Sequence, residues 1–581
     1  MWFVCLALVW ATSSFALSPG QRVDNFRLLD HKGASHELYY LSDIKAVVII
    51  TQGNGCPIVR KALPDLKNIS DRYAAQGVSF LLLNSNLQDD RASVAKEVAE
   101  FGIAFPVMMD TTQLIGESLG VERTAEVLVI DPKTWKLAYR GPIDDRLHYA
   151  AQKPAAGKHY LVAALDAVLA GREVSESAVD APGCLVNFPE RDNRVAHKQI
   201  SYAQTIAPML IDKCMSCHRA GGIGPWAMSD YQKVRGFAPM MREVLRTQRM
   251  PPWNADPHFG RFVGDRSLSV EQVQTLVHWI EAGAPRGEGE DPLVSASQRP
   301  WSEWTLGEPD LIVEVPAFEV PASGAVSYQY PVARNPLDRD RWIRAVEIQP
   351  GDRAVVHHVL AGIVDPKRPQ FVGSIGELGG YAPGKNAAPY PEDTGILLRK
   401  DASFRFQMHY TPNGKVVTDV TRIGIYFYDA PPKHELKMNL IYDTRLSIPA
   451  HAKSHSESLE HVFEGDVMLY SLLPHAHLRG KAAKYTAFYP DGREETLLSV
   501  PKLDFNWQTT YFFQDPKLLP GGTRVRLDMT WDNSAQNPLN PDPHQTVGWG
   551  DQTWEEMNVG WLRYRDAVEG ELKLEVSGVL R

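Results

Sequence analysis

The chain has few cysteines, and its C-terminal half has none. Five cysteines occur among the 581 residues, and the last of them is Cys217. Everything beyond Cys217 must therefore fold without disulfides, and a segment of that size can bury enough apolar surface to do so. The C-terminal part of the chain is thus not a small disulfide-stabilised scaffold.

Basic runs and long apolar runs are also missing from the body of the chain. The sequence has 61 Lys and Arg against 70 Asp and Glu, a net charge of −9, and no stretch that interleaves basic and aromatic residues. This composition argues against nucleic-acid binding. After the first 16 residues, no run approaches the roughly 20 apolar residues that a spanning helix needs, so we expect no stable membrane span.

The N-terminal segment differs from the rest of the chain. MWFVCLALVWATSSFA carries no charged side chain and ends in the small-x-small pattern Ser14-Phe15-Ala16. The pattern predicts a secretory signal peptide over residues 1–16, and hence a periplasmic or secreted protein. A short membrane anchor is the alternative, because the usual basic residues at the start are absent.

Changes of pattern along the chain predict a multidomain protein. Residues 17–190 alternate β-branched runs such as KAVVIIT with helical stretches, which indicates an α/β domain. Residues 198–290 are mostly helical, and Ser269 and Gln272 form a capping box before a helix. Beyond a polar linker, short alternating strands separated by turn signals predict two all-β sandwich domains, over residues 305–432 and 436–581.

The most specific motif is CMSCH, at Cys214, Cys217 and His218. C-x-x-C-H is the attachment motif of c-type haem, in which both thiols bind the vinyl groups and the histidine binds the iron. A thioredoxin-like dithiol or half of a zinc site are the alternatives. Zinc would need further ligands nearby, and no cysteine follows. The motif therefore predicts covalently bound haem c in a cytochrome c domain.

The second axial ligand of the haem should be a methionine or a histidine. Met250 lies in RMPPW, where two prolines favour an extended loop. This segment resembles the Met-Pro loop of small class I-type cytochromes c, and the resemblance implies Met250 as the ligand, with His258 as the alternative. Haem c also implies an exported bacterial protein.

Histidines recur in the predicted β region. VVHHV contains His357 and His358, FQMHY contains His409, and LLPHAHLRGK contains His475 and His477. Two histidines at positions i and i+2 of a strand point to one face, which suits metal chelation. Each pair alone is common by chance, but five histidines in one cysteine-free β region favour metal binding.

These motifs together resemble the copper type II ascorbate-dependent monooxygenases, which include the peptidylglycine and dopamine β-monooxygenases. The resemblance covers about residues 305–581 and implies two jelly-roll-like sandwiches and two copper ions. The ligands that it implies are His357, His358 and His409 for one ion, and His475, His477 and Met557 for the other. Imidazole suits both oxidation states of copper, and thioether suits Cu(I). Met529 is the competing methionine, but it lies in an alternating strand and is expected in the core.

Departures from the family pattern bear on the substrate. Peptide-hydroxylating members carry an arginine for the substrate carboxylate two residues before the H-x-H pair, where this chain has Leu473. Their Asn and Tyr after the methionine are replaced by Val559 and Trp561. We therefore expect a neutral or apolar small-molecule substrate rather than a peptide with a free carboxylate.

The adjacent histidines also raise a geometric question, because successive side chains of a strand point to opposite faces. If His357 and His358 bind one copper ion, the strand must end, twist or bulge at this point. A flat strand would exclude the three-histidine site.

The α/β domain contains a cysteine at a strand–helix junction. QGNGCPIVRK, around Cys56, resembles the redoxin branch of the thioredoxin fold. Val59 stands where a C-x-x-C motif would have its second cysteine, and Ala125 stands at the usual cis-proline. Cys184 is the other candidate redox thiol, and we expect it to pair with Cys56 as a structural or slow redox disulfide. A degenerate scaffold is the alternative.

Three redox modules in one chain favour a relay. The leading hypothesis is an oxidoreductase, a copper-dependent monooxygenase that hydroxylates a C–H bond with O₂. Haem c, fed by an external donor, would deliver single electrons. The alternatives are a non-catalytic haem and copper electron-transfer or copper-binding protein, and a thiol- or haem-dependent peroxidase.

Overall fold

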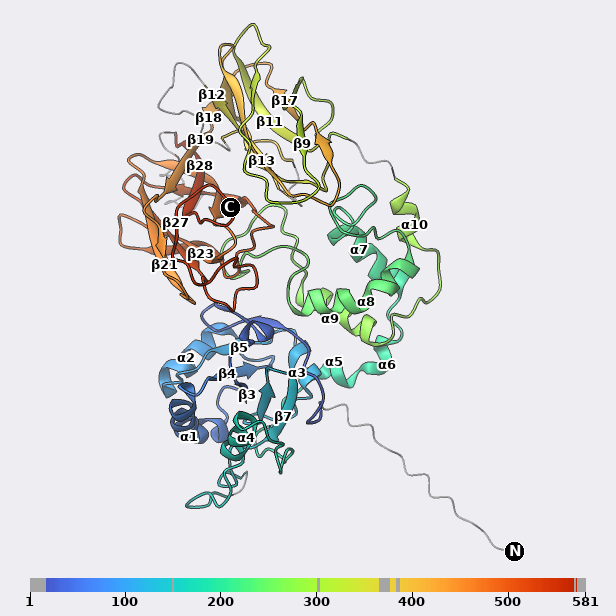
Figure 1. Cartoon of the computed structure of the whole chain (residues 1–581), viewed down its shortest axis with the longest axis vertical. Helices are drawn as coiled ribbons and strands as arrows, with labels where there is room; N and C mark the ends of the chain where they lie inside the picture. Colours follow the sequence, from blue (N-terminus) through green and yellow to red (C-terminus); the bar gives the residue numbers. More distant parts are fainter. Residues whose placement is uncertain are drawn as a thin grey trace, which may run out of the picture. The chain divides into compact units, whose positions relative to one another are not determined.

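The computed structural model describes residues 17–148, 151–299, 303–364, 377–382, 387–568 and 571. The predicted signal peptide lies outside the described residues. The chain divides into two compact units (Figure 1). The first unit comprises Met1–Ile200, Phe237–Met250 and Leu268–Gly287, and the second comprises Ser201–Gly236, Pro251–Ser267 and Glu288–Arg581.

A five-stranded sheet in the order β5-β4-β3-β6-β7 forms the centre of the first unit. Its strands are β3 (Ala46–Gln52), β4 (Val78–Asn84), β5 (Val107–Met109), β6 (Val127–Asp131) and β7 (Lys136–Gly141). β3, β4 and β5 run parallel, whereas β6 and β7 are antiparallel to their neighbours. The central strand β3 is buried along its whole length, as its β-branched sequence predicts.

Helices cover both faces of this sheet. α1 (Pro57–Ala74), α2 (Arg91–Phe101) and α4 (Tyr160–Leu169) contribute to the apolar cluster on one face. α3 (Leu114–Leu119) contributes to the cluster on the other face, with β1 (Arg27–Leu29) and the short helix η1 (Leu38–Leu41). The layers are those of a thioredoxin-like domain, which confirms the predicted α/β fold.

The remaining helices are divided between the two units. α5 (Pro189–Asp192), α6 (Arg194–His197) and α9 (Val270–Glu281) belong to the first unit, whereas η2 (Tyr202–Ile206), α7 (Ala207–Lys213) and α10 (Pro292–Ser297) belong to the second. α8 (Tyr231–Arg246) extends across the division. The capping box of Ser269 and Gln272 is present at the start of α9. A separate all-α domain over residues 198–290 stays a prediction.

Two β-sandwiches follow in the second unit. The first has the sheets β10-β15-β12-β13 and β18-β14-β11-β17-β8, and the second has β19-β28-β22-β25 and β21-β26-β23-β24. Eight of these strands complete the sheets around the site: β8 (Leu311–Glu314), β10 (Val332–Arg334), β11 (Arg341–Gln349), β14 (Thr394–Leu398), β17 (Arg422–Phe427), β18 (His434–Glu435), β21 (His455–Val462) and β23 (Gly480–Phe488). The strands that matter for the site are β12 (Val356–Val364), β13 (Gly379–Tyr381) and β15 (Ser403–Tyr410) in the first sandwich. In the second they are β19 (Lys437–Tyr442), β22 (Val467–His475), β24 (Glu494–Val500), β25 (Tyr511–Leu519), β26 (Arg524–Trp531) and β28 (Val559–Asp566).

Each sandwich has its own apolar core. Alternating residues of β12 and β15, such as Val359, Phe404 and Met408, fill the first core, and β26 contributes Leu527 and Met529 to the second. Met529 is fully buried, as expected of a core methionine. Among the described residues, no helix has the length and apolar character needed to cross a bilayer.

Candidate functional site

The two thiols of the first unit face each other. Cys56 follows β3 as the N-cap residue of α1, directly before Pro57, and its side chain is only 4% exposed. Its Sγ lies 3.6 Å from Sγ of Cys184 and 3.0 Å from Oγ1 of Thr124. Both cysteines are free thiols in this structure. A disulfide needs about 2.05 Å between the sulfur atoms, so only a small approach separates the pair from a bond.

The surroundings distinguish the two thiols. Burial opposes ionisation of Cys56, but hydrogen bonds from Thr124 and from the backbone of Val59 and Cys184 lower its pKa below the ordinary value. Burial and the neighbouring Cys56 raise the pKa of Cys184. Since the thiolate is the nucleophile in thiol–disulfide exchange, this arrangement would make Cys56 the more reactive thiol of the pair.

Backbone contacts hold Cys184 beside Cys56. The amide of Thr124 donates to the carbonyl of Cys184, whose own amide donates to Oγ1 of Thr124. Gly183 lies so close to this loop that a Cβ there would stand 1.7 Å from the carbonyl oxygen of Thr124. Ala125, at the position of the usual cis-proline, has a positive φ of 57°. The chain thus requires glycine at 183 to bring Cys184 into place.

The C-x-x-C-H motif lies at the end of α7 in the second unit. Cys214 is the C-cap residue of that helix, and its carbonyl accepts the amides of Cys217 and His218. Nδ1 of His218 lies 3.1 Å from the carbonyl oxygen of Trp226, so it is the protonated nitrogen and donates to that oxygen. Nε2 of His218 therefore carries the lone pair that iron would need. The two free thiols and this tautomer fit a covalently attached haem.

The predicted axial ligand Met250 belongs to the first unit, whereas the haem motif belongs to the second. His258 belongs to the second unit, and its Nδ1 lies 3.0 Å from a carboxylate oxygen of Asp256. The assignment of the second axial ligand stays a prediction.

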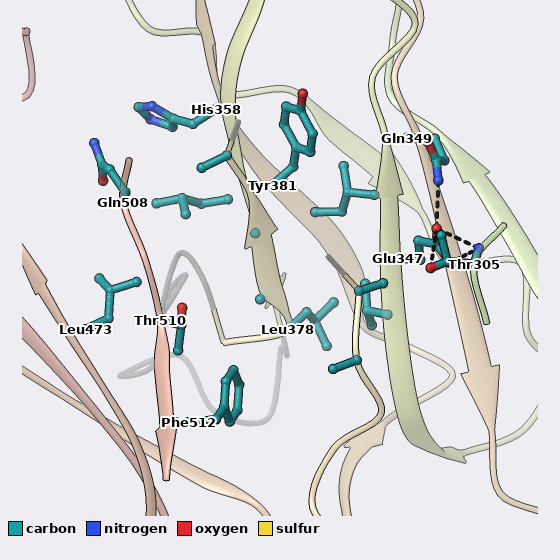
Figure 2. A pocket seen from close by; sticks show the side chains of 18 of the residues that line it. Thr305, Glu347, Gln349, His358, Leu378, Tyr381, Leu473, Gln508, Thr510 and Phe512 are labelled. Atoms are coloured by element: carbon teal, nitrogen blue, oxygen red, sulfur yellow. Dashed lines mark hydrogen bonds between the residues drawn. The ribbon is translucent and has the colours of Figure 1, made fainter. Parts of the chain in front are cut away.

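A cavity of about 200 Å³ connects the haem motif with the first sandwich. Cys217 and Arg219 line it on one side, and His358 and Tyr381 line it from β12 and β13. In Figure 2, His358 and Gln508 lie toward one end of the cavity and Phe512 lies toward the other.

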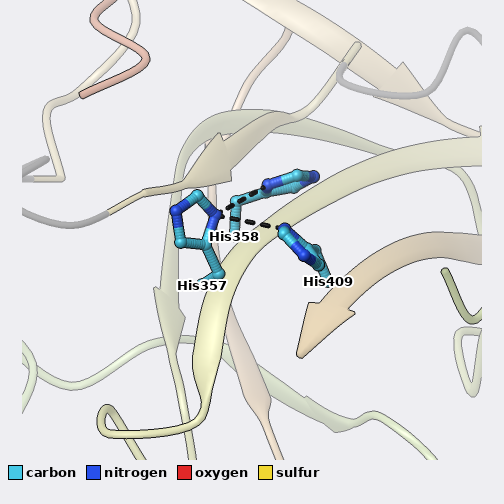
Figure 3. A group of neighbouring side chains, drawn as sticks. All are labelled: His357, His358 and His409. Atoms are coloured by element: carbon cyan, nitrogen blue, oxygen red, sulfur yellow. Dashed lines mark hydrogen bonds between the residues drawn. The ribbon is translucent and has the colours of Figure 1, made fainter. Parts of the chain in front are cut away.

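Three imidazoles converge beside this cavity. Nδ1 of His357 lies 3.4 Å from Nδ1 of His358 and 3.2 Å from Nδ1 of His409 (Figure 3). One ligand atom from each ring lies within 4.8 Å of the others. Burial lowers the pKa of all three, to about 3 for His409, so the rings are neutral and their lone pairs are available. Three neutral imidazole nitrogens in this arrangement fit a copper ion.

The local strand geometry answers the question of the adjacent histidines. His358 pairs directly with His409 across β12 and β15, and the register of the two strands shifts between Val356 and His358. His357 is the extra residue at this irregularity. Because a bulge re-aims the side chain, both neighbouring imidazoles reach the same side. The predicted irregularity at 357–358 is confirmed.

The H-x-H pair lies at the end of β22 in the second sandwich. The rings of His475 and His477 are 5.2 Å apart. Nδ1 of His475 donates to Oε1 of Gln508 over 2.6 Å, and Nδ1 of His477 donates to the carbonyl of Glu555 over 3.1 Å. Nε2 of His477 is buried and has no partner within the described part of the chain. Both Nε2 atoms thus carry the lone pair of their ring, and the orphaned nitrogen of His477 fits a metal ion.

Glu556 joins this pair to the backbone of Met557. Its carboxylate accepts the amides of His477, Arg479 and Met557 over 2.8, 2.6 and 3.3 Å. Burial raises the pKa of Glu556 to about 7. Met557 precedes β28 and is half-buried. The Glu556 carboxylate thus links the backbone of Met557 to that of His477, while the role of the Met557 thioether stays a prediction.

Comparison with known proteins bears on the first unit. Residues 18–150 match the Redoxin family. The N-terminal domain is a redoxin domain. The matched segment contains Cys56 and ends before Cys184, so the partner thiol comes from the chain that follows the matched part.

Relatives of the redoxin domain are thiol–disulfide enzymes. Thiol-disulfide oxidoreductase ResA of Halalkalibacterium halodurans is 27% identical over 112 residues, which are 19% of this chain and 62% of that protein. ResA of Bacillus subtilis is 26% identical over 118 residues, 20% of this chain and 64% of that protein. The chain thus spans less than two thirds of the length of either relative. A thiol–disulfide redox function fits the redoxin domain.

Solved structures also match part of the chain. A hypothetical protein from Sinorhizobium meliloti 1021 is 29% identical, with 29% of this chain and 94% of that chain covered and a TM-score of 0.27. Peroxidoxin BcpB from Mycobacterium tuberculosis is 18% identical, with 26% and 95% covered and a TM-score of 0.21.

A further histidine pair lies beside the redoxin domain. The rings of His197 and His278 are stacked 4.1 Å apart with their planes 8° from parallel. Nε2 of His278 lies 2.9 Å from a carboxylate oxygen of Glu117 in α3. A metal ion lies in the plane of an imidazole that binds it, so two parallel stacked rings do not converge on one ion. This group is a buried link between α9 and the redoxin domain.

Sequence reasoning missed the residues that hold the two histidine groups in place. Asn506, Gln508 and Glu556 each bond to a histidine of the two groups or to its backbone, but none belongs to a motif. Of the three, only Glu556 could have been noticed from the sequence, because it directly precedes Met557, the predicted copper ligand.

Proposed function

We propose that the chain is an exported bacterial copper-dependent monooxygenase that hydroxylates a C–H bond with O₂ and receives single electrons through covalent haem c. The convergence of the three Nδ1 atoms of His357, His358 and His409 is the observation that carries the proposal. When bound, haem would transfer single electrons, and copper would store one electron and activate O₂.

The haem and the two copper ions would each be held by residues that the sequence motifs identify. Cys214 and Cys217 would bind the haem covalently and His218 would bind its iron, with Met250 as the predicted second iron ligand. His357, His358 and His409 would hold one copper ion, and His475, His477 and Met557 would hold the other. The acceptors at Trp226, Gln508 and Glu555 support this assignment, because each fixes the tautomer that leaves a ligand nitrogen free.

The cavity supports delivery of electrons to the three-histidine site. Cys217 and His358 line the same cavity, so the haem motif and this site face a common space. Leu360, Leu378 and Ile348 give this space apolar walls, which exclude water from the charges that redox change creates. The resemblance to the copper monooxygenases implies the division of labour: His357, His358 and His409 would serve electron storage, and His475, His477 and Met557 would serve the reaction with O₂.

The cavity also supports a substrate without a free carboxylate. Leu473 and Trp561 line it where peptide-hydroxylating enzymes would offer a charge partner. Three arginines line the cavity, Arg219, Arg353 and Arg563. Two of them are engaged by the protein, since Arg353 donates to Gln349 and Arg563 donates to the carbonyl of Glu377. We expect a neutral or apolar small molecule.

Mixing the anaerobically reduced holoprotein with O₂ tests the relay. Haem and copper are expected to become oxidised together, because electrons lost at copper are replaced from haem within the same chain. Stopped-flow absorption of the haem bands, with freeze-quench electron paramagnetic resonance (EPR) for Cu(II), would follow both. Haem that stays reduced while copper turns over would overturn the relay, and a single bound copper would favour the non-catalytic alternative.

A second function is favoured by the 3.6 Å approach of the two thiols. The redoxin domain would act as a thiol–disulfide oxidoreductase. The Cys56 thiolate attacks a substrate disulfide, which forms a mixed disulfide and releases one thiolate. Cys184 then attacks Cys56, which forms the Cys56–Cys184 disulfide and releases the second thiol. The protein dithiol is oxidised and the substrate disulfide is reduced.

Glutathione disulfide is a suitable probe for this pair. After exposure, non-reducing peptide mapping of the wild type should give a peptide that links Cys56 to Cys184. The variant Cys184→Ser should instead carry glutathione on Cys56, and Cys56→Ser should remain unmodified because burial raises the pKa of Cys184. Two free thiols in the treated wild type would contradict a redox role.

A further inference from the structure

One short segment of the second sandwich contacts both histidine groups. Residues 504–508 lie in the connection between β24 and β25. Three of them reach a histidine: Phe505, Asn506 and Gln508. No sequence motif marks this segment, and the family resemblance assigns it no role.

Phe505 fills the space between the two groups. Its ring stacks on His357 at 5.0 Å with planes 14° apart, and it meets His477 edge-on at 5.9 Å. His409 lies 6.0 Å away on the same side as His357. The phenyl ring is buried. An apolar ring in van der Waals contact with both groups keeps water out of the space between them.

Asn506 and Gln508 each accept a hydrogen bond from one group. Oδ1 of Asn506 lies 3.4 Å from Nε2 of His357, and Oε1 of Gln508 lies 2.6 Å from Nδ1 of His475. An amide oxygen can only accept a hydrogen bond. The ring nitrogen that faces it must therefore carry the hydrogen. The lone pair is then on Nδ1 in His357 and on Nε2 in His475. The first of these faces the other two Nδ1 atoms of its group.

The segment itself fixes the orientation of both amides. Nδ2 of Asn506 donates to the carboxylate of Asp504 over 3.1 Å, which turns Oδ1 toward His357. Nε2 of Gln508 donates to the carbonyl of Phe505 over 3.4 Å, which turns Oε1 toward His475. Neither amide can flip without losing its donor contact.

We propose that residues 504–508 form a clamp that sets the ligating tautomer of one histidine in each copper site and holds the two sites at a fixed spacing. Asn506 is the positioning residue for the three-histidine site, Gln508 is the positioning residue for the H-x-H site, and Phe505 is the spacer between them. The clamp rests on the proposed function, because it acts on the copper ligands that this function requires.

Copper affinity tests the roles of Asn506 and Gln508 separately. Gln508→Leu removes the acceptor at similar size and should weaken the H-x-H site by about 10- to 100-fold, with the three-histidine site unchanged. Asn506→Leu should weaken the three-histidine site by a similar factor. Gln508→Glu and Asn506→Asp keep an acceptor oxygen and should restore affinity. The haem-loaded full chain would be titrated with Cu(II) against a competing chelator, and EPR would assign each site.

A matched control is available in the same sandwich. Asn439 also pairs with a histidine, since its Nδ2 lies 2.8 Å from Nε2 of His461, but that histidine belongs to neither group. Asn439→Leu should leave both copper affinities unchanged. Near-ultraviolet circular dichroism would show that each variant is folded.

The outcomes separate the clamp from the proposed function. A wild type that binds two copper ions, with equal affinities in the leucine variants, would overturn the clamp and leave the monooxygenase proposal standing. A wild type that binds no copper would overturn both. Loss of affinity in Gln508→Leu that Gln508→Glu does not restore would indicate a packing effect and would also overturn the clamp.

Discussion

Replacing His409 by alanine is expected to remove one of the two copper ions and to leave the covalent haem in place. Nδ1 of His409 lies 3.2 Å from Nδ1 of His357, and the two rings share one side of the first sandwich. Two imidazoles bind copper far more weakly than three, so the copper content should fall from about two ions per chain to about one. Elemental analysis of the purified protein would give the copper-to-haem ratio.

The spectrum should identify which ion is lost. The Cu(II) signal that remains in His409→Ala should match the one that is lost in His477→Ala. Electrons from haem should no longer reach O₂ in His409→Ala, because the storage site is empty, so the haem should stay reduced after mixing with O₂. His461→Ala removes a half-buried histidine outside both groups and serves as the control. A His409→Ala variant that keeps two copper ions would exclude the three-histidine site.

The three-histidine group shows how far local sequence reasoning reaches. Two adjacent histidines in a strand can bind one ion only if the strand is irregular, and the register does shift at that point between β12 and β15. The rule that side chains alternate across a strand was enough to predict the irregularity, because the histidines and the irregularity lie in the same few residues. The same locality explains why the capping box of α9 and the buried strand β3 follow their sequences.

The clamp residues show where that reasoning ends. Phe505 and Gln508 act on histidines that lie about 30 to 150 positions away in the chain. Phenylalanine and glutamine in a loop are ordinary, and only the packing of two sandwiches gives them a role. Cys184 was found because few cysteines remain, but its approach to Cys56 depends on Gly183 and the loop at Thr124. Contacts of this kind are properties of the tertiary fold and have no periodicity to detect.

Replacing Cys217 by alanine is expected to reduce the yield of haem with two thioether bonds to zero. Cys214 and Cys217 are the only thiols of the motif, and each would bind one vinyl group. The one remaining thiol, that of Cys214, can form at most one thioether bond to the haem. The carbonyl of Cys214 would still accept the amides of residues 217 and 218, so the turn that presents His218 should persist.

Pyridine haemochrome spectra distinguish these states, because each thioether bond that replaces a vinyl group shifts the absorption band. The wild type should give the spectrum of a haem with two thioethers, and Cys217→Ala that of a haem with one or none. Cys184→Ala serves as the control, since Cys184 belongs to the redoxin pair and should leave the haem spectrum unchanged. A wild type without covalent haem, or a Cys217→Ala variant with the wild-type spectrum, would contradict the haem assignment. The first result would leave the three-histidine site without its expected electron donor, because Cys217 and His358 share the cavity that links the two.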